Sequence, residues 1–323
     1  MIKAKLLALL GLLVVLCLLS IAVGARQLPP VDVVKSLFGG DVPDVDSIIW
    51  GSRIPRTALG LLVGAALGLA GAVMQALTRN PLADPGLLGI SAGAAFGVVV
   101  AIAGLGITSL YGYIWFAIAA ALITSVVVYL LGRGNPVTLA IAGVAVSALL
   151  TSVTNGISLI SPEALDRYRF WAAGSLAGQD MRLVMSVLPF ILAGAVLAAG
   201  TAPALNSLAL GDDVAAALGR RTHLLRIKGA AAITLLTGAA VAAIGPVVFL
   251  GLVVPHVARM ITGPDHRWLL PFAAVLAPIL LLGADILGRI LGRPGEVNVG
   301  IVVAFLGAPV FVALVRRRRL AEL

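Results

Sequence analysis

Long stretches without a charged residue recur along almost the whole chain. Eight such windows are Leu6–Ala25, Thr57–Thr78, Pro85–Gly132, Gly134–Pro162, Leu183–Gly211, Gly229–Ala258, Trp268–Ala284 and Val297–Val315. A helix that crosses the hydrocarbon core of a bilayer needs about 20 mostly apolar residues. Hydrophobic residues make up 60% of the sequence and charged residues only 11%, whereas about a quarter of a soluble domain is charged. The sequence therefore predicts a membrane protein with many spans and excludes an ordinary soluble enzyme.

Two of these windows are too long for a single crossing. The window Pro85–Gly132 contains a glycine-rich break at residues 104–106, and Gly229–Ala258 contains Gly245-Pro246. Proline removes a backbone donor and clashes with the preceding turn, and glycine weakens a helix. Dividing both windows gives an all-α membrane protein of about ten transmembrane helices, with the eighth at about residues 247–261.

The distribution of basic residues predicts how the chain is oriented. Lys3 and Lys5 precede the first window, which is longer than the core of a secretory signal, so we expect an uncleaved first helix. With the N-terminus inside, 14 of the 23 Lys and Arg residues lie on the inner side and 9 on the outer side. Cytoplasmic loops carry such an excess. Both termini are therefore predicted to be cytoplasmic, and the net charge of +9 indicates orientation rather than a nucleic-acid partner.

Three connecting segments are longer than a turn, at residues 27–56 and 161–182 outside and at 201–228 inside. The inner segment is rich in Ala and Leu, which favour helices. Asp212 and Asp213 suit the first turn of a helix, and Gly219 suits a helix end. We expect two short cytoplasmic helices at about residues 205–220, with an apolar face that needs a partner.

The sequence offers little machinery for catalysis. It has no Gly-x-x-x-x-Gly-Lys-[Ser/Thr] phosphate loop, so the chain is not expected to hydrolyse ATP. Its three histidines are scattered and Cys17 is its only cysteine, so we expect no metal and no bound cofactor. Asp285 lies within a predicted span, and Arg289 at i+4 predicts a local ion pair. An ion-coupled secondary carrier, which usually places ionisable groups at the membrane midplane, stays as an alternative in which Asp285 would titrate.

Loop motifs carry a resemblance to a known transporter family. They are Arg53-Ile54-Pro55-Arg56, Gln75 to Gly86 with Asn80-Pro81-Leu82-Ala83-Asp84-Pro85-Gly86, Gly89-Ile90-Ser91-Ala92-Gly93, Gly245-Pro246 with Pro255-His256, Gly263-Pro264-Asp265-His266-Arg267, and Gly307-Ala308-Pro309. In this order they resemble the FecCD family, the permease subunits of ABC importers for ferric siderophores, haem and vitamin B12. The resemblance implies a single permease domain over residues 1–323 with a type II importer bundle like that of vitamin B12 permeases.

The same resemblance implies partners and a cargo. The partners are two cytoplasmic ATPases that bind ATP and Mg²⁺, a second permease that is either another copy or a related chain, and an external substrate-binding protein. The implied location is the bacterial cytoplasmic membrane, with lipid around the bundle and no nucleic acid. A ferric siderophore is the expected cargo, because it is the family's commonest and because Ala83-Asp84-Pro85-Gly86 resembles one half of siderophore systems with two permeases. Haem and vitamin B12 stay open.

The resemblance also implies roles for particular residues. The residues implied in coupling to the ATPase are Leu210, Gly211, Asp212, Asp213, Ala215, Ala216, Leu218 and Gly219. Those implied in docking of the binding protein are Arg53, Arg56 and Arg289. Those implied in the cytoplasmic gate are Asn80, Leu82 and Thr138. Each role has a simpler alternative. The coupling segment could be an ordinary amphipathic helix, the arginines could anchor a span at the headgroups, and Asn80 could simply start a turn.

The outer segment 161–182 holds a basic and aromatic group of residues. Arg167, Tyr168, Arg169 and Trp171 are predicted to line an outer vestibule. Such a rim would suit an anionic iron chelate, although Tyr and Trp are also common at membrane interfaces for their own sake.

Overall fold

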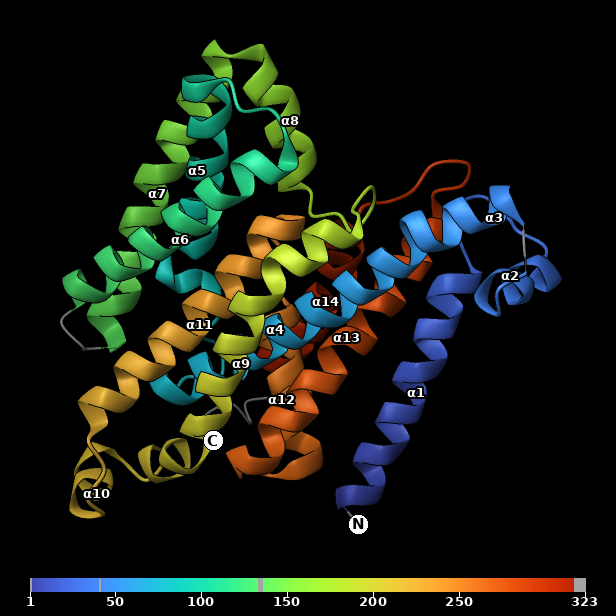
Figure 1. The fold of residues 1–323 in the computed structure, drawn as a ribbon. Coiled ribbons are helices and arrows are strands. Elements are labelled where there is room, and N and C mark those ends of the chain that lie inside the picture. Colours follow the sequence, from blue (N-terminus) through green and yellow to red (C-terminus); the bar gives the residue numbers. More distant parts are fainter. Residues whose placement is uncertain (1, 41, 133–135, 317–323) are drawn as a thin grey trace.

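The computed structural model describes residues 2–40, 42–132 and 136–316, and within these ranges the chain is helical without any strand. In chain order the helices are α1 (Ile2–Ala22), α2 (Pro30–Leu37), α3 (Pro43–Ile48), the π-helix η1 (Ile49–Arg53), α4 (Ile54–Thr78), the 3₁₀ helix η2 (Pro85–Leu88), α5 (Ile90–Leu105), α6 (Leu110–Gly132), α7 (Pro136–Ile160), α8 (Pro162–Ala172), α9 (Met181–Leu208), α10 (Asp212–Ala217), α11 (Thr222–Ile244), α12 (Leu250–Thr262), α13 (His266–Leu291) and α14 (Val299–Arg316). Figure 1 shows their arrangement.

Ten of these helices account for the predicted spans. Seven are long and apolar enough to cross a membrane by themselves, namely α1, α4 with α3 and η1, α6, α7, α9, α11 and α13. Three shorter apolar helices, α5, α12 and α14, complete the set. The breaks between α5 and α6 and between α11 and α12 occur at the predicted glycine and proline positions. The predicted all-α architecture with about ten membrane helices is confirmed.

Two of the spans form the centre of the bundle. The most apolar windows of α4 and α11 are 78% and 72% buried, whereas those of α1 and α7 are only 6% and 11% buried. Small residues let the central helices approach closely, as they do in lipid. A Cβ added at Gly64 of α4 would lie 2.6 Å from Cα of Pro278 in α13. The core therefore forms around α4 and α11, while α1 and α7 lie at the periphery (Figure 1).

Two helices of the bundle are too short to cross the bilayer by themselves. α5 has 16 residues and α12 has 13, which corresponds to about 24 and 20 Å at 1.5 Å per residue, against about 30 Å of hydrocarbon. Both begin inside the bundle, because their first residues Ile90 and Leu250 have no exposed surface. An irregular segment precedes each of them, and the segment before α5 includes two of the predicted gate residues, Asn80 and Leu82.

The inner segment differs from the prediction in one respect. α9 continues to Leu208, so the expected first short helix is the end of this span, and α10 is the only separate short helix there. Residues 202–208 are rich in Ala and Leu, which favour helix continuation. Pro203 removes one backbone donor without ending the helix.

Sequence analysis overlooked three short helices in the outer segments, namely α2, α3 and α8. Their starts share a local signal, a proline at the first helical position with an acidic residue in the first turn: Pro30 with Asp32, Pro43 with Asp44, and Pro162 with Glu163. Proline suits this position because its fixed φ is helical and its missing donor would be unpaired there. The signal was present but the prediction did not use it.

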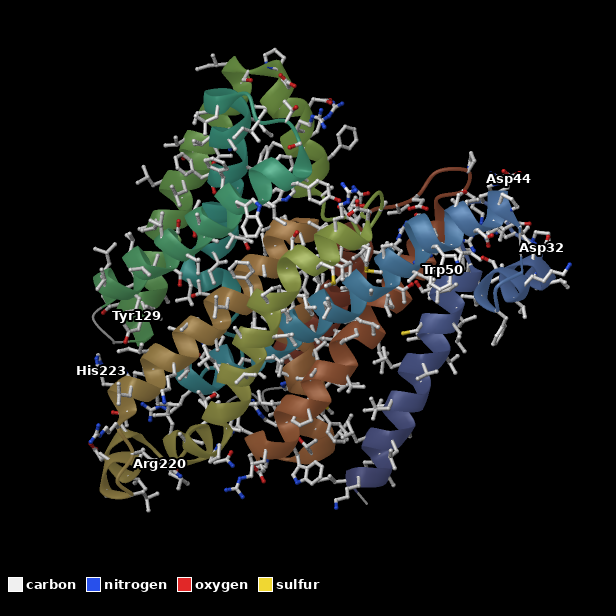
Figure 2. All side chains as sticks on the ribbon, in the orientation of Figure 1. Asp32, Asp44, Trp50, Tyr129, Arg220 and His223 are labelled. Atoms are coloured by element: carbon white, nitrogen blue, oxygen red, sulfur yellow. The ribbon has the colours of Figure 1, made fainter. Side chains whose placement is uncertain are left out.

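Segments that are predicted to lie on the same side of the membrane gather at the same end of the bundle. The N-terminal end of α1, the helix α10 and the turn between α12 and α13 lie toward the lower edge of Figure 1, and α2, α3 and α8 lie toward the opposite end. Figure 2 shows Arg220 and His223 at the first end and Asp32 and Asp44 at the second. After the predicted orientation, we call these the cytoplasmic end and the outer end.

Candidate functional site

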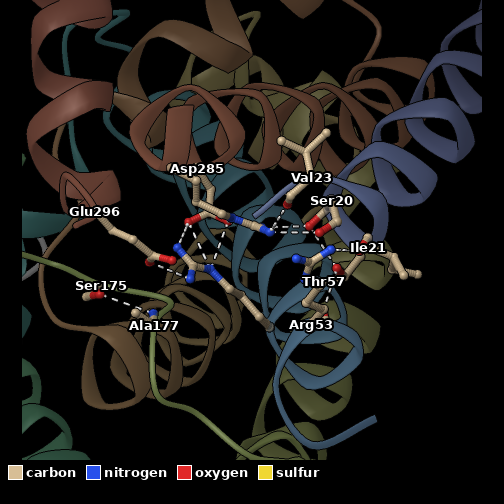
Figure 3. Close-up of polar contacts among 11 residues, drawn as sticks. Ser20, Ile21, Val23, Arg53, Thr57, Ser175, Ala177, Asp285 and Glu296 are labelled. Atoms are coloured by element: carbon tan, nitrogen blue, oxygen red, sulfur yellow. Dashed lines mark hydrogen bonds and ion pairs between the residues drawn. The ribbon is translucent and has the colours of Figure 1, made fainter. Parts of the chain in front are cut away.

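Three arginines that sequence analysis placed at the outer face are buried in the chain. The exposed fractions are 4% for Arg53, 7% for Arg56 and 1% for Arg289. Together with Asp285 and Glu296 they form what we call the outer arginine cluster, where α4 and α13 meet the outer end of α1 (Figure 3). Their guanidinium groups therefore have partners inside this chain.

Asp285 lies at the centre of the cluster and is 1% exposed. Arg56 donates to it from Nε at 3.0 and 3.2 Å and from Nη2 at 2.7 Å, and donates from Nη1 to Glu296 at 2.6 Å. Arg289 donates to the same carboxylate from Nε at 3.0 Å and also from Nη2. The predicted pair between Asp285 and Arg289 is confirmed, and Arg56 is a second partner that sequence spacing did not reveal.

The arginines also cap the last turn of α1. Arg289 Nη1 donates to the carbonyl oxygens of Ser20 and Val23 at 2.7 and 2.9 Å. Arg53 Nη1 donates to the carbonyl oxygens of Ile21 and Ala22 at 2.7 and 2.6 Å. The last carbonyl groups of a helix lack partners within it and carry partial negative charge, so cations stabilise them. The cluster thereby attaches the peripheral α1 to α4 and α13. Docking of a binding protein to these arginines stays a prediction.

The predicted coupling residues surround α10 at the cytoplasmic end. Gly211 precedes the helix with a φ of 109°, and Gly219 follows it with a φ of 75°, both in the region that favours glycine. Ala215 is buried, while Leu210 and Leu218 are 64% and 59% exposed; Asp213 and Ala216 are exposed as well. The neighbouring Val214 is 45% exposed, so three apolar side chains are accessible in and beside α10, with Leu210 and Leu218 just outside the helix.

Asp212, the first residue of α10, joins two other segments through ion pairs. Arg79, which directly follows α4, approaches Asp212 Oδ2 to 2.7 Å, and Arg226 in the first turns of α11 approaches Oδ1 to 2.9 Å. The side chains of Arg79 and Asp212 are 43% and 36% exposed. Solvent therefore screens these pairs much more strongly than the outer arginine cluster.

The predicted gate residues lie in exposed positions in two places, after the end of α4 and at the start of α7. Asn80 Oδ1 accepts a hydrogen bond from Leu82 N at 2.9 Å, so Asn80 does start the turn that the simpler alternative proposed. Leu82 is 37% exposed. Thr138 lies in the first turn of α7 and is exposed. The gate role of these residues stays a prediction, because a gate would form only against another permease chain.

An outer cavity of about 400 Å³ lies beside α8. Residues from four parts of the chain line it, among them Tyr113, Arg167, Phe170, Trp171, Gln179 and Asn298. Of the four predicted vestibule residues, Arg167 and Trp171 face the cavity. Tyr168 stacks on Trp171 with 6.3 Å between ring centroids, and burial raises its pKa above the usual range. Arg169 instead pairs with Asp166 at 2.6 Å in an exposed position.

Helical spacing explains which of the predicted vestibule residues line the cavity. Arg167, Phe170 and Trp171 are related by i, i+3 and i+4, so they share one face of α8, and Arg169 lies on another. This periodicity could have identified Phe170. Tyr113 and Asn298 are distant in sequence and had no local signal, and Gln179 lies beyond α8 in the same outer segment, where helical spacing does not apply. Within the described ranges no group of three His, Cys, Asp or Glu side chains could hold a metal ion.

Comparisons with known proteins agree along nearly the whole chain. A model of the FecCD transport family matches residues 12–317. The chain is 48% identical to the ferric enterobactin transport system permease protein FepD of Escherichia coli (strain K12), covering 96% of this chain and 94% of that protein. It is 39% identical to the hemin transport system permease protein HmuU of Yersinia pestis, covering 96% and 95%. A solved inward-facing structure of a metal-chelate type ABC transporter matches with a TM-score of 0.88 and 30% identity, covering 98% and 99%.

Proposed function

The chain belongs to the FecCD transport family, and we propose that it is the permease subunit of a bacterial ABC importer that moves a ferric siderophore inward. The resemblance that the loop motifs indicated is thereby confirmed. The observation that carries the proposal is the 48% identity over 96% of the chain to a ferric enterobactin permease. In this proposal residues 1–323 form one permease domain in the cytoplasmic membrane, and two partner ATPases bind ATP and Mg²⁺.

The apolar face beside α10 supports docking of an ATPase at the cytoplasmic end. Leu210, Val214 and Leu218 are 64%, 45% and 59% exposed, although they lie beyond the spans, where water rather than lipid would surround them. Exposed apolar patches outside the membrane commonly mark protein interfaces. α10 packs against α9 and α11. A displacement of α10 by the closing ATPases would therefore reach α11, one of the two central helices, and rock the bundle.

Alternating access would then open and close the two ends of a pathway between two permease chains. The turn that contains Asn80 and Leu82 would form the cytoplasmic gate together with Thr138 in the first turn of α7. Most of the selectivity for the cargo would lie in the external binding protein. This division of labour suits a bundle whose described spans contain few ionisable groups away from the outer arginine cluster.

The outer cavity supports an anionic, aromatic iron chelate as cargo. Arg167 supplies positive charge, the carboxylate of Asp166, which also lines the cavity, is paired with Arg169, and Tyr113, Phe170 and Trp171 supply aromatic surface. Aromatic arms of a chelate would stack on these rings, and Arg167 would lie against the face of such an arm. The same guanidinium group would attract the negative charge of the chelate, so an anionic chelate with aromatic arms suits this rim. Haem and vitamin B12 are the competing cargoes. Competition among a ferric tricatecholate, haemin and vitamin B12 for uptake by the reconstituted importer would separate them.

For the binding protein, we propose a docking surface above the outer arginine cluster. The outer arginine cluster contains two carboxylates, and Glu296 is the more exposed of them, with 28% of its side chain accessible. A carboxylate of the binding protein would take the place of Glu296 on Arg56. Glu296→Gln should then tighten binding of the binding protein to the importer. Unchanged binding would favour the alternative in which these arginines serve only this chain.

Mass spectrometry of proteins that co-purify with the tagged chain in mild detergent tests the assembly. Recovery of an ABC ATPase supports the proposal, and a different permease alongside it indicates a heterodimer. This chain as the only permease indicates a homodimer. If no ATPase is recovered in several detergents, an ion-coupled carrier becomes the better explanation. That alternative needs a titrating carboxylate, and Asp285 already pairs with two arginines.

A further inference from the structure

Asp212 occupies a junction of three cytoplasmic segments with different proposed tasks. It begins α10, where the ATPase is proposed to dock. One carboxylate oxygen pairs with Arg79, the residue that joins α4 to the predicted gate turn, at 2.7 Å. The other oxygen pairs with Arg226 of the central helix α11 at 2.9 Å. One side chain thus contacts the residue before the predicted gate turn and the cytoplasmic end of the central helix α11 at the same time.

The backbone at Arg79 indicates that its side chain matters. Arg79 has a φ of 48° and a ψ of 36°, the left-handed conformation. It ends α4 with hydrogen bonds from Arg79 N to Ala76 O and from Asn80 N to Gln75 O, at 3.3 and 3.1 Å. Glycine is the usual residue at such a helix end, because a Cβ in this conformation is crowded. An arginine here accepts that strain and reaches Asp212.

The exposure of the two ion pairs makes a purely stabilising role a poor explanation. The side chains of Arg79, Asp212 and Arg226 are 43%, 36% and 21% exposed. Ion pairs accessible to water contribute little to stability because solvent and salt screen them. The same accessibility lets such contacts break and form again without a large barrier. The geometry suits a connection that is made and released as α10 moves.

We infer that Asp212 is a positioning residue for transport, which passes movement of α10 to the gate turn through Arg79 and to α11 through Arg226. The inference rests on the proposed function, because it needs an ATPase docked at α10. The ATPase would still dock without these ion pairs, since Leu210, Val214 and Leu218 supply the apolar contact. ATP hydrolysis would then continue, but fewer hydrolysis events would open the gate. Loss of the junction therefore predicts uncoupling rather than loss of assembly.

Arg79→Gly is the most informative variant. It removes the guanidinium group but relieves the left-handed strain, so a damaged turn cannot explain its effect. In the complete importer reconstituted in vesicles, uptake of ferric tricatecholate per ATP hydrolysed should fall about 5-fold, the most that loss of one exposed ion pair can produce. Asp212→Asn should cause a similar fall. The double variant should be no worse than Asp212→Asn alone, because that substitution already removes the ion pair with Arg79 as well as the one with Arg226.

Arg220→Gln is the matched control, since Arg220 is an exposed arginine just beyond α10 with no ion pair in the described part of the chain. It should leave uptake per ATP unchanged. Additive losses in the double variant, or an unchanged ratio in Arg79→Gly, would overturn the inference. So would a result in which Asp212→Asn releases the ATPase from the complex while Arg79→Gly remains fully coupled. If the unaltered complex shows no ATP-dependent uptake at all, the proposed function fails instead.

Discussion

The outer arginine cluster and the Asp212 junction use the same pair of charged groups in opposite surroundings. At the outer end, Asp285 and its partner Arg289 are each 1% exposed. At the cytoplasmic end, the carboxylate of Asp212 and its partner Arg79 are 36% and 43% exposed. Arginine and aspartate form hydrogen-bonded ion pairs at both ends, so the difference lies in burial.

Burial determines what such a pair can do in a transporter. Breaking a buried pair costs a large free energy, because each ion would be left without water and without a partner. An exposed pair can exchange its partner for water at little cost. The outer arginine cluster is therefore suited to hold α1, α4 and α13 together throughout a cycle. The Asp212 junction is suited to change during one.

The largest effect is expected from removing the central carboxylate of the outer arginine cluster. Asp285→Ala leaves Arg56 and Arg289 buried without their shared partner, and breaking a buried pair in this way costs about 3–5 kcal/mol. Thermal unfolding of the purified chain in detergent measures the loss. Asp166→Ala is the matched control, because Asp166 pairs with Arg169 in an exposed position, and it should cost less than about 1 kcal/mol. Equal stability of the two variants would contradict the distinction.

A smaller effect is expected where α1 joins the cluster. The hydroxyl of Ser20 lies 2.8 Å from Thr57 Oγ1 and accepts from Arg289 Nη2 at 2.8 Å, with no exposed surface. Ser20→Ala should destabilise the chain by about 1–3 kcal/mol, since a buried guanidinium loses an acceptor. Ser152→Ala changes an exposed serine and should have an effect within about 0.5 kcal/mol. Unfolding midpoints in the same detergent compare the two, and a silent Ser20→Ala would argue against attachment of α1 here.

At the Asp212 junction, stability should hardly change. Arg79→Gly loses one exposed ion pair and relieves left-handed strain, so the free energy of unfolding should shift by less than about 1 kcal/mol. Thermal unfolding checks this expectation alongside the uptake measurement. Severe destabilisation by Arg79→Gly would mean that the junction is part of the folded core and would remove the contrast with the outer end.

Salt should produce the smallest effect and only at the cytoplasmic end. Raising ionic strength from about 0.1 to 1 M shortens the Debye length from about 10 to 3 Å. Uptake per ATP should fall about two-fold, as expected from weakening an exposed pair by roughly 0.5 kcal/mol. The Asp212→Asn importer should not show this dependence. A salt effect of the same size in both proteins would place its origin elsewhere, for example at the ATPase interface.

Much of the fold could be predicted because its signals are local. Charge-free windows of about 20 residues marked the spans, and Gly245-Pro246 marked the break between α11 and α12. The pair Asp285 and Arg289 followed from spacing within one helix. The short outer helices also had a local signal in Pro30, Pro43 and Pro162, which the prediction overlooked.

The candidate site was less predictable because its contacts join distant segments. Arg56 and Asp285 are separated by 229 positions, and Arg79 and Asp212 by 133. Arg53 binds backbone carbonyl groups of α1, and no residue type marks such a partner in a sequence. Family resemblance suggested which residues matter, whereas only the folded chain shows which of them are already paired within it.

Uptake by vesicles that contain the complete importer tests the central claim most directly. The account predicts that a ferric tricatecholate accumulates only when the ATPase subunits are present and ATP is supplied to them. Collapse of proton and sodium gradients should leave uptake unchanged. Uptake by the permease without ATPase subunits, driven by an ion gradient, would contradict the account.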